Sequence, residues 1–331
     1  MSAASVAVKT AVKAKELHGL LPVNKPVGIV SKDVSRWLEK RLGRLHIGHV
    51  GTLDPAASGV LPILLGRATR LQDHLLEMPK TYEFDVTLGS ETDTLDLDGQ
   101  VVRTGPFLHV TTSALAAAVQ DFIGDFEQTP PLFSAVKYKG KPLYEYARAN
   151  AGDQVPLEEL KRRVQVSRFD LVSFEGGVGR FSVTCSKGTY VRALVKDVAE
   201  KVGSCGTLTR LVRTSAAGVS LSSTLDLEAI EAQLDDFASL VMPIEQLDLG
   251  MPKWRCASVG EGIAAKIHGG QQVAIDYATF VSGFSEDASQ AALTGWSRPL
   301  LLLDTQGRAF GVGAARRSEG GRVLVAMKRG L

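Results

Sequence analysis

Two runs of alternating apolar and polar residues, separated by glycines, constrain the fold of this chain most. The runs "RRVQVSRFDLVSFEG" (162–176) and "GRFSVTCSKG" (179–188) alternate with a period of two and meet at Gly176–Gly179. A period of two places successive side chains on opposite faces of a strand, so the pattern predicts a long β-hairpin. A hairpin of this length favours a fold with a largely antiparallel sheet.

Other segments add both strands and helices to this hairpin. Since 331 residues suggest about two domains, we place a change of domain near residue 249, beyond which short strands dominate. The mixture predicts the α+β class with a mostly antiparallel sheet, followed by a small β-rich domain. The predicted strands are 19–26, 80–89 and 99–105, the last as the hairpin partner of 80–89. One predicted helix is capped by Ser31, and the others span 67–77, 112–123, 142–150 and 189–202. Residues 277–297 are a predicted loop.

The segment "IGHVGTLDPAASGVLPILLGRATR" (47–70) is rich in glycine and proline, and we expect much of 48–66 to be loop. Asp54 stands in it between Leu53 and Pro55, and Pro55 favours an extended backbone at Asp54. An aspartate at such a place commonly starts a turn. From the residues alone, a turn and a catalytic carboxylate both remain open for Asp54.

The net charge is only +2, but the charges are unevenly distributed. Residues 1–80 carry +6, 81–130 carry −8, 131–215 carry +7 and 216–331 carry −3. Two basic blocks separated by an acidic one could form a positive cleft for a polyanion such as nucleic acid. An ordinary solvated surface explains the same counts equally well.

Several kinds of site are excluded. No window approaches 18 apolar residues, so no membrane span is expected. Three scattered cysteines favour a reducing cytoplasm and no zinc ribbon. Residues 260–265 match only part of a dinucleotide-binding pattern, and residues 93–99 match only part of a calcium loop. His46 and His49 lack the further ligands that a metal site needs. We expect residues 1–19 to form a disordered basic tail.

Five ordered segments resemble one known family. The segment 47–70 resembles the catalytic motif G-H-x-G-x-L-D-P-x-A-[ST]-G of the TruB family, the tRNA pseudouridine-55 synthases. Four others match in the same order: "VNKPVGIVSKDV" (23–34), "KTYEFDVTLGSETDTLDLDGQV" (80–101), "TPPLFSAVKYKGKPLYEYAR" (129–148) and "CSKGTYVRALVKDV" (185–198). The resemblance covers about 20–250, and the chain beyond 250 resembles the PUA-type RNA-binding module loosely.

The resemblance implies a pseudouridine-synthase fold with a curved, mixed, mostly antiparallel sheet over 20–249. It implies a thumb-like excursion at about 128–156 and a PUA-like RNA-binding domain at 250–331. The activity it implies is isomerisation of uridine to pseudouridine in the TΨC loop of tRNA, at position 55. No cofactor and no metal are implied, and we expect a monomer that acts in the cytoplasm.

The resemblance also assigns roles to individual residues. Asp54 becomes the carboxylate that acts as nucleophile or as base, and the residues leave both routes open. Arg192 becomes its cationic partner, and Tyr82 stacks on the flipped uracil and helps proton loss from carbon 5. The expected substrate contacts are a space-filling His49, a second site tyrosine at Tyr190, an apolar Leu211, and the thumb lysines Lys137 and Lys139.

The chain departs from the family pattern at Val212, where L-R-R-T is usual, so one phosphate contact is lost while Arg210 and Arg213 remain. Two other functions stay open. One is a stand-alone pseudouridine synthase for another RNA. The other is a non-catalytic RNA-binding or RNA-folding protein, which would need basic and aromatic residues but no buried carboxylate.

Overall fold

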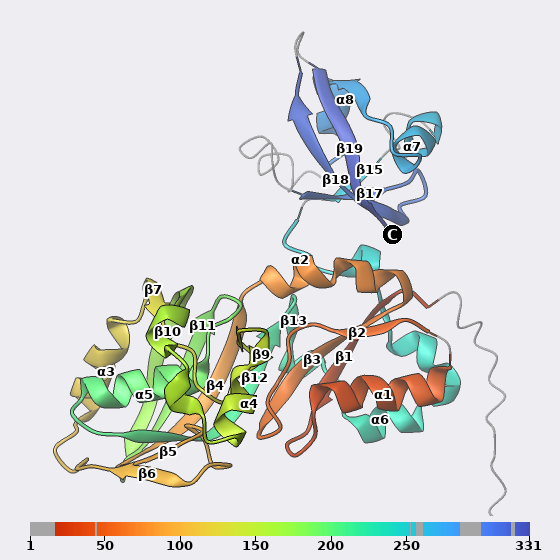
Figure 1. Ribbon diagram of the computed structural model, residues 1–331. Coiled ribbons are helices and arrows are strands. Elements are labelled where there is room, and N and C mark those ends of the chain that lie inside the picture. Colours follow the sequence, from red (N-terminus) through yellow and green to blue (C-terminus); the bar gives the residue numbers. More distant parts are fainter. Residues whose placement is uncertain (1–16, 44, 252, 256–260, 285–298, 319–321) are drawn as a thin grey trace, which may run out of the picture.

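The structure, a computed structural model, describes residues 17–43, 45–251, 253–255, 261–284, 299–318 and 322–331. A larger body carries a long sheet with helices, and a smaller β-rich unit lies beside α2 with the C-terminus at the junction (Figure 1). Leu17 is buried and Gly19 already begins a strand, so the expected tail reaches less far than residue 19. Residues 1–16, which make up the rest of that predicted tail, lie outside the described residues.

Ten strands of the described residues form the sheet of the body. Its main path runs β14-β1-β3-β12-β4-β11-β10-β7; β2 pairs with β3 and β13 with β12. Only the β3–β12 pairing is parallel, so the predicted mixed, mostly antiparallel sheet is confirmed. The strands are β1 (Gly19–Lys25), β2 (Ile47–His49), β3 (Ala57–Leu65), β4 (Lys80–Leu88), β7 (Gly124–Gln128), β10 (Arg162–Glu175), β11 (Val178–Cys185), β12 (Gly206–Ala216), β13 (Val219–Ser220) and β14 (Met242–Pro243).

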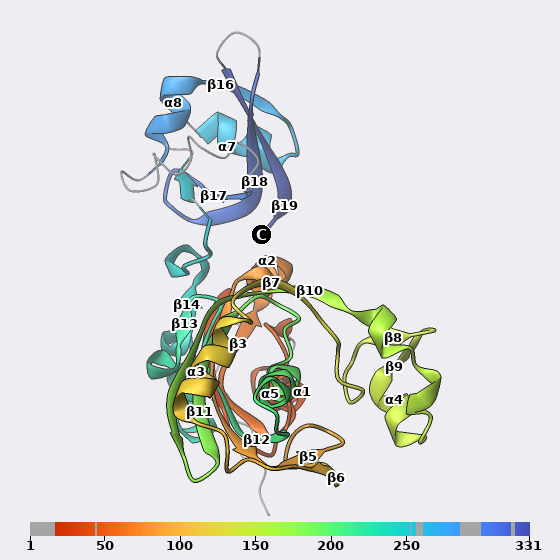
Figure 2. The ribbon, with the colours of Figure 1, turned by 90° about the vertical axis from the view of Figure 1, so that its left-hand side faces the viewer.

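Helices cover the two halves of this sheet in separate apolar clusters. Helices α3 and α5 pack on β4, β10 and β11, where Phe84, Phe169 and Phe181 gather with ring centroids 5.3–6.0 Å apart. Helices α1 and α6 pack on β1 and β3. Figure 2 shows the sheet curving around α5 and α1. The helices are α1 (Ser31–Leu42), α2 (Gln72–Glu77), α3 (Thr112–Gln120), α4 (Leu143–Arg148), α5 (Val191–Lys201) and α6 (Leu227–Ala232).

The expectation that much of 48–66 is loop was wrong for its second half. Residues 57–65 form the buried strand β3, although it contains Gly59 and Pro62. Pro62 faces Pro22 of β1 in the antiparallel register, and the Pro62 carbonyl accepts from Val50 on the opposite side. Both prolines therefore sit where the β1–β3 ladder does not need an N–H from them. Gly59 lets β12 approach, because a Cβ there would lie 2.3 Å from the carbonyl oxygen of Arg213.

Two further local predictions were wrong. The segment 99–105 does not pair with β4; within it, β6 (Val101–Thr104) pairs with β5 (Ser90–Thr92). Both edges of β4 are already taken by β11 and β12. Ser31 does not cap α1, whose N-cap is Val30; its hydroxyl instead bonds the backbone of Leu53.

The predicted excursion at 128–156 projects from the sheet on the side of α5 and α1 (Figure 2). It contains the two-residue strands β8 (Lys137–Tyr138) and β9 (Lys141–Pro142), and α4. Val136, Leu143 and Val155 form its own small apolar cluster. We call residues 128–156 the thumb.

The second sheet has five strands among the described residues, in the order β15-β17-β18-β19-β16, with α7 and α8 beside it. The prediction of a loop over 277–297 was wrong for its start, which is helical, and 285–298 lie outside the described residues. Leu301, Leu303 and Leu331 share one buried cluster with the body. The elements are β15 (Lys253–Arg255), α7 (Glu261–His268), β16 (Val273–Asp276), α8 (Tyr277–Ser282), β17 (Pro299–Leu303), β18 (Ala309–Arg317) and β19 (Arg322–Gly330).

Candidate active site

The loop between β2 and β3 carries Asp54 and is held at several backbone points. The Ser31 hydroxyl accepts from Leu53 N at 2.9 Å and bonds Leu53 O at 3.1 Å. Gly28 N donates to Pro55 O at 2.8 Å. Ala57 N donates to Asp54 O at 3.0 Å, so Asp54 does start a turn. The turn and the catalytic interpretation are therefore compatible, because the turn engages only the Asp54 backbone.

The Asp54 side chain forms an ion pair with Arg192 of α5. Arg192 Nη2 lies 2.9 Å from Asp54 Oδ2, and Arg192 Nε lies 3.6 Å from Asp96 Oδ2. The guanidinium also donates to Thr94 O at 2.8 Å and Phe133 O at 3.0 Å. Arg192 is 7% exposed, whereas the Asp54 side chain is 45% exposed. A buried, fully engaged cation thus presents an accessible carboxylate, as a nucleophile or base requires.

A cavity of about 430 Å³ opens beside this ion pair. Asp54, Tyr82, Tyr190, Arg192 and Leu211 all line it. A second hollow of about 660 Å³ meets the first at Asp54, Arg192 and Leu211. The structure therefore brings together five of the eight residues that the resemblance named, around a space of the size that small-molecule sites have.

Tyr82 reaches the cavity from β4. Its neighbour across β12 is Arg213. Burial raises the pKa of the Tyr82 phenol, and the Arg213 guanidinium acts against that increase. The phenol is thus kept neutral in an apolar setting with one cation beside it, which suits stacking on an uncharged ring.

Two lysines near the loop are almost completely buried. Lys25 Nζ donates to the carbonyls of Pro26 and Ile29, and Lys80 Nζ donates to those of Leu76 and Met78. Burial lowers the pKa of each lysine to about 8; for Lys25 the Asp54 carboxylate acts in the opposite direction. The surroundings of Asp54 are therefore rich in positive charge, which favours a polyanionic ligand.

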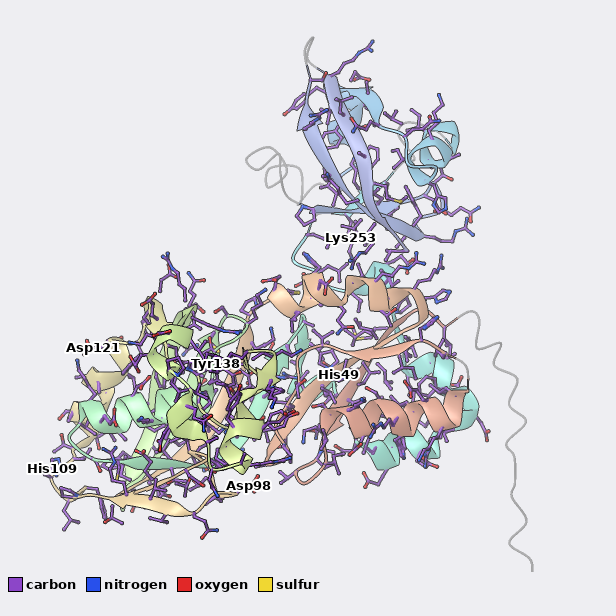
Figure 3. The ribbon with its side chains drawn as sticks, viewed as in Figure 1. His49, Asp98, His109, Asp121, Tyr138 and Lys253 are labelled. Atoms are coloured by element: carbon purple, nitrogen blue, oxygen red, sulfur yellow. The ribbon has the colours of Figure 1, made fainter. Side chains whose placement is uncertain are left out.

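His49 ends β2 and does not line the 430 Å³ cavity. Its Nδ1 lies 3.3 Å from Ser35 Oγ and its Nε2 lies 3.4 Å from Thr52 Oγ1. Burial lowers the pKa of His49, and Arg213 lowers it further. Figure 3 shows His49 by the strands of the body, above α1.

The remaining predicted substrate contacts are of two kinds, residues held by the body and exposed residues on the thumb. The Tyr190 backbone forms two hydrogen bonds with the Gln128 side chain, and Leu211 packs in the cluster under α5. Lys137 and Lys139 are exposed on the thumb and do not line either hollow. Lys139 has a φ of +47° and its ammonium lies 5.0 Å from the Tyr138 ring centroid.

Sequence reasoning missed Asp96 and misread Arg213. Asp96 stands in the acidic run 92–99, which belongs to a family-like segment but was given no role of its own; its carboxylate faces Arg192. Arg213 was expected to contact phosphate, but it is 1% exposed. Its burial follows from the pairing of β12 with β4, where it lies opposite Tyr82, and no local sequence signal indicates that pairing.

Two further findings concern metal sites and membrane-spanning helices. Within the described ranges, no three or more His, Cys, Asp and Glu side chains gather as a metal site would require. No helix in the described part of the chain is long and apolar enough to cross a membrane.

Comparisons with known proteins identify the family of this chain. The profile of the TruB family pseudouridylate synthase N-terminal domain matches residues 39–191. A tRNA pseudouridine synthase B of Lactobacillus gasseri is 40% identical over 253 residues, covering 72% of this chain and 81% of that protein. The Lactobacillus acidophilus protein of the same name is 36% identical, covering 87% of this chain and 98% of its own.

Solved structures show the same fold. A crystal structure of a Cbf5-Nop10-Gar1 complex superposes with a TM-score of 0.69 at 22% identity, covering 95% of this chain and 84% of that one. The predicted pseudouridine-synthase fold with a PUA-like unit is thereby confirmed. On the identity and coverage of its relatives, the chain belongs to the TruB family of pseudouridylate synthases.

Proposed function

We propose that this chain converts uridine to pseudouridine at position 55, in the TΨC loop of tRNA. Its family makes it a pseudouridine synthase, an isomerase, and its relatives carry the name tRNA pseudouridine synthase B. The observation that carries the proposal is the Asp54–Arg192 ion pair, since a carboxylate oriented by a cation at the edge of a cavity is the group that this isomerisation needs.

The reaction conserves every atom of the nucleoside. The bond from sugar C1′ to uracil N1 breaks, a bond from C1′ to uracil C5 forms, the C5 proton leaves, and N1 gains a proton. Asp54 either attacks C1′ or removes the 2′ proton, and both routes start from the ionised carboxylate. Arg192 lies 2.9 Å from that carboxylate and orients it.

Uracil has to leave the base stack to reach Asp54, at a cost of a few kcal/mol. Tyr82 would stack on the flipped base, which recovers about 1–3 kcal/mol, and would assist proton loss from C5. Tyr190 and Leu211 would complete the walls of the base pocket. His49 would occupy the space that the base leaves in the RNA, which fits its place outside the cavity.

The thumb would close over the RNA stem-loop. Lys137 and Lys139 would then meet the phosphate backbone, which fits their exposure and their distance from the reacting atoms. We also propose the division at residues 249 and 250, with 20–249 as the catalytic domain and 250–331 as a PUA-like RNA-binding domain. The enzyme would act in the cytoplasm as a monomer, which light scattering of the purified protein tests.

The experiment that tests the function combines a rate with a map. Transcribed tRNA with tritium at uracil C5 is incubated with the protein, tritium release is followed, and pseudouridine is located by sequencing. We expect release of one tritium per tRNA and pseudouridine at position 55 only. A transcript with cytidine at position 55 serves as the control and should release none. Modification elsewhere would favour a synthase for another RNA, and tRNA binding without release would favour a non-catalytic protein.

A further inference from the structure

Arg213 is one of the largest completely buried side chains of the body. It lies on β12, where its Cα is in register with Gly59 of β3 on one side and Tyr82 of β4 on the other. Its backbone therefore lies between the strand that follows the Asp54 loop and the strand that carries Tyr82. The β3 and β12 backbones approach closely at this point, because a Cβ at Gly59 would lie 2.3 Å from the Arg213 carbonyl oxygen.

The Arg213 guanidinium bonds both ends of the Asp54 loop. Nε donates to Val60 O at 2.7 Å, and Nη2 donates to Gly51 O at 2.9 Å. Nη2 also lies 3.5 Å from Val50 O. Gly51 precedes Asp54 and Val60 follows it, so one planar group joins the two ends of the segment that carries the carboxylate. No carboxylate of the described residues forms an ion pair with Arg213, and its Nε and Nη2 bond carbonyl oxygens.

A direct RNA contact does not fit this arrangement. At 1% exposure Arg213 cannot present its guanidinium to a phosphate, and its Nε and Nη2 already donate to the carbonyls of Val60 and Gly51. Arg213 can therefore influence the reaction only through the protein groups around it. Arg213 borders the same cavity as Asp54 and Tyr82, and its charge acts on the Tyr82 phenol.

We propose that Arg213 is a positioning residue for the isomerisation: its guanidinium fixes the Asp54 loop and Tyr82 relative to each other. The inference rests on the proposed function, since it assumes that Asp54 and Tyr82 act on one base. Misplacing a reacting group by about 1 Å can reduce a rate by about a hundredfold. Removing the Arg213 hydrogen bonds should therefore lower the rate of the chemical step and leave the affinity for RNA unchanged.

Arg213→Lys is the sharpest variant. A lysine keeps the positive charge but has no planar fork, so it cannot join Gly51 O and Val60 O in the same geometry. Arg213→Gln removes the charge as well. The matched control is Arg180→Lys, because Arg180 is an arginine of the same sheet that is 52% exposed, pairs with Asp85 and lines neither hollow.

The experiment measures the single-turnover rate and the tRNA dissociation constant of the parent and the three variants at one common temperature. That temperature lies at least about 10 °C below the lowest of their melting temperatures. We expect Arg213→Lys to lose at least about thirtyfold in single-turnover rate while the dissociation constant stays within about threefold. Arg213→Gln should lose more, and Arg180→Lys should match the parent in both quantities.

Three results would overturn the proposal. The first is a folded Arg213→Lys protein with a rate within about threefold of the parent, whatever its melting temperature. The second is an equal loss of rate and affinity, which would make Arg213 a binding residue. The third is an equal loss in Arg180→Lys, which would make the effect general to the sheet. A parent protein that releases no tritium from any uridine-containing RNA would instead refute the proposed function.

Discussion

The cavity floor and the thumb use positive charge in opposite ways. By the floor we mean the buried cations around Asp54. Of these, Arg192 and Arg213 are at most 7% exposed and bond groups far along the chain; Arg192 joins Asp54, Thr94 and Phe133. On the thumb, cations are exposed and their contacts are local, as between Lys139 and Tyr138 or between Arg148 and Tyr144. Figure 3 labels Tyr138 on the thumb and His49 on the body.

This contrast separates positioning from attraction. A cation buried among carbonyls holds backbone segments in one arrangement, and removing it leaves polar groups unsatisfied. An exposed lysine attracts phosphate without fixing anything inside the protein. Variants of the floor should therefore change the rate, and variants of the thumb should change the affinity. The predictions below test that division.

The largest effect after loss of Asp54 itself is expected for Arg192→Met. Removing one partner of a buried ion pair costs about 3–5 kcal/mol, so the rate should fall by at least about a hundredfold. Single-turnover tritium release measures it, with a melting curve beside it to identify lost stability. A rate within about threefold of the parent would show that Arg192 is not the partner of Asp54.

Tyr82→Phe and Tyr82→Leu should distinguish the stacking role of the Tyr82 ring from a role of its hydroxyl in proton removal. Phenylalanine preserves stacking and leucine loses it, a difference of about 1–3 kcal/mol. Tyr82→Phe should bind tRNA normally and turn over slowly, and Tyr82→Leu should lose rate and some affinity. Equal and unimpaired rates in both variants would reduce Tyr82 to a packing residue.

Lys80→Met tests whether the floor really buries charge. The folded-state pKa of Lys80 is about 8 and its ordinary value is 10.5. Between these two pH values the unfolded chain binds the proton and the folded chain does not, so stability rises with pH. The unfolding free energy of the parent, minus that of Lys80→Met, should therefore rise from pH 8 to 10 by at most about 1.4 kcal/mol per unit. Urea unfolding across this range checks it, and a difference independent of pH would contradict the burial of a charged group.

The smallest effect is expected for the double variant Lys137→Gln with Lys139→Gln. Each lost phosphate contact should reduce the slope of log affinity against log salt by about 0.7–0.9. The rate at saturating tRNA should not change. Lys201→Gln is the matched control, because that exposed lysine pairs with Asp121 away from the thumb. Filter binding at several salt concentrations measures the slopes, and an unchanged slope would remove these lysines from the RNA contact.

Local patterns were enough to predict the α+β class and the mostly antiparallel sheet, and the resemblance added the pseudouridine-synthase fold. Alternation predicted the β10–β11 hairpin, and its turn lies at Gly176–Gly177 as expected. They failed at β3, because Gly59 and Pro62 indicate loop unless their partners on β12 and β1 are known. Strand pairing across the sheet depends on contacts between distant segments, which a local pattern does not contain.

The site was predictable only in part for the same reason. The resemblance named the residues that line the cavity, since they stand in recognisable motifs. It gave no role to Asp96, and Ser31 was assigned to a helix cap, although both act on residues far along the chain. Arg213 was assigned to phosphate from the family pattern L-R-R-T, which carries no information on burial.

The most direct test of the division between floor and thumb sets Asp54→Asn beside the Lys137→Gln, Lys139→Gln double variant. Single-turnover rate and tRNA dissociation constant are measured for both under one salt condition. Asp54→Asn should show no detectable turnover and a dissociation constant within about tenfold of the parent, since its many RNA contacts remain. The thumb variant should bind more weakly and keep its rate at saturation. Turnover by Asp54→Asn, or a thumb variant that loses rate at saturation while binding normally, would contradict the account.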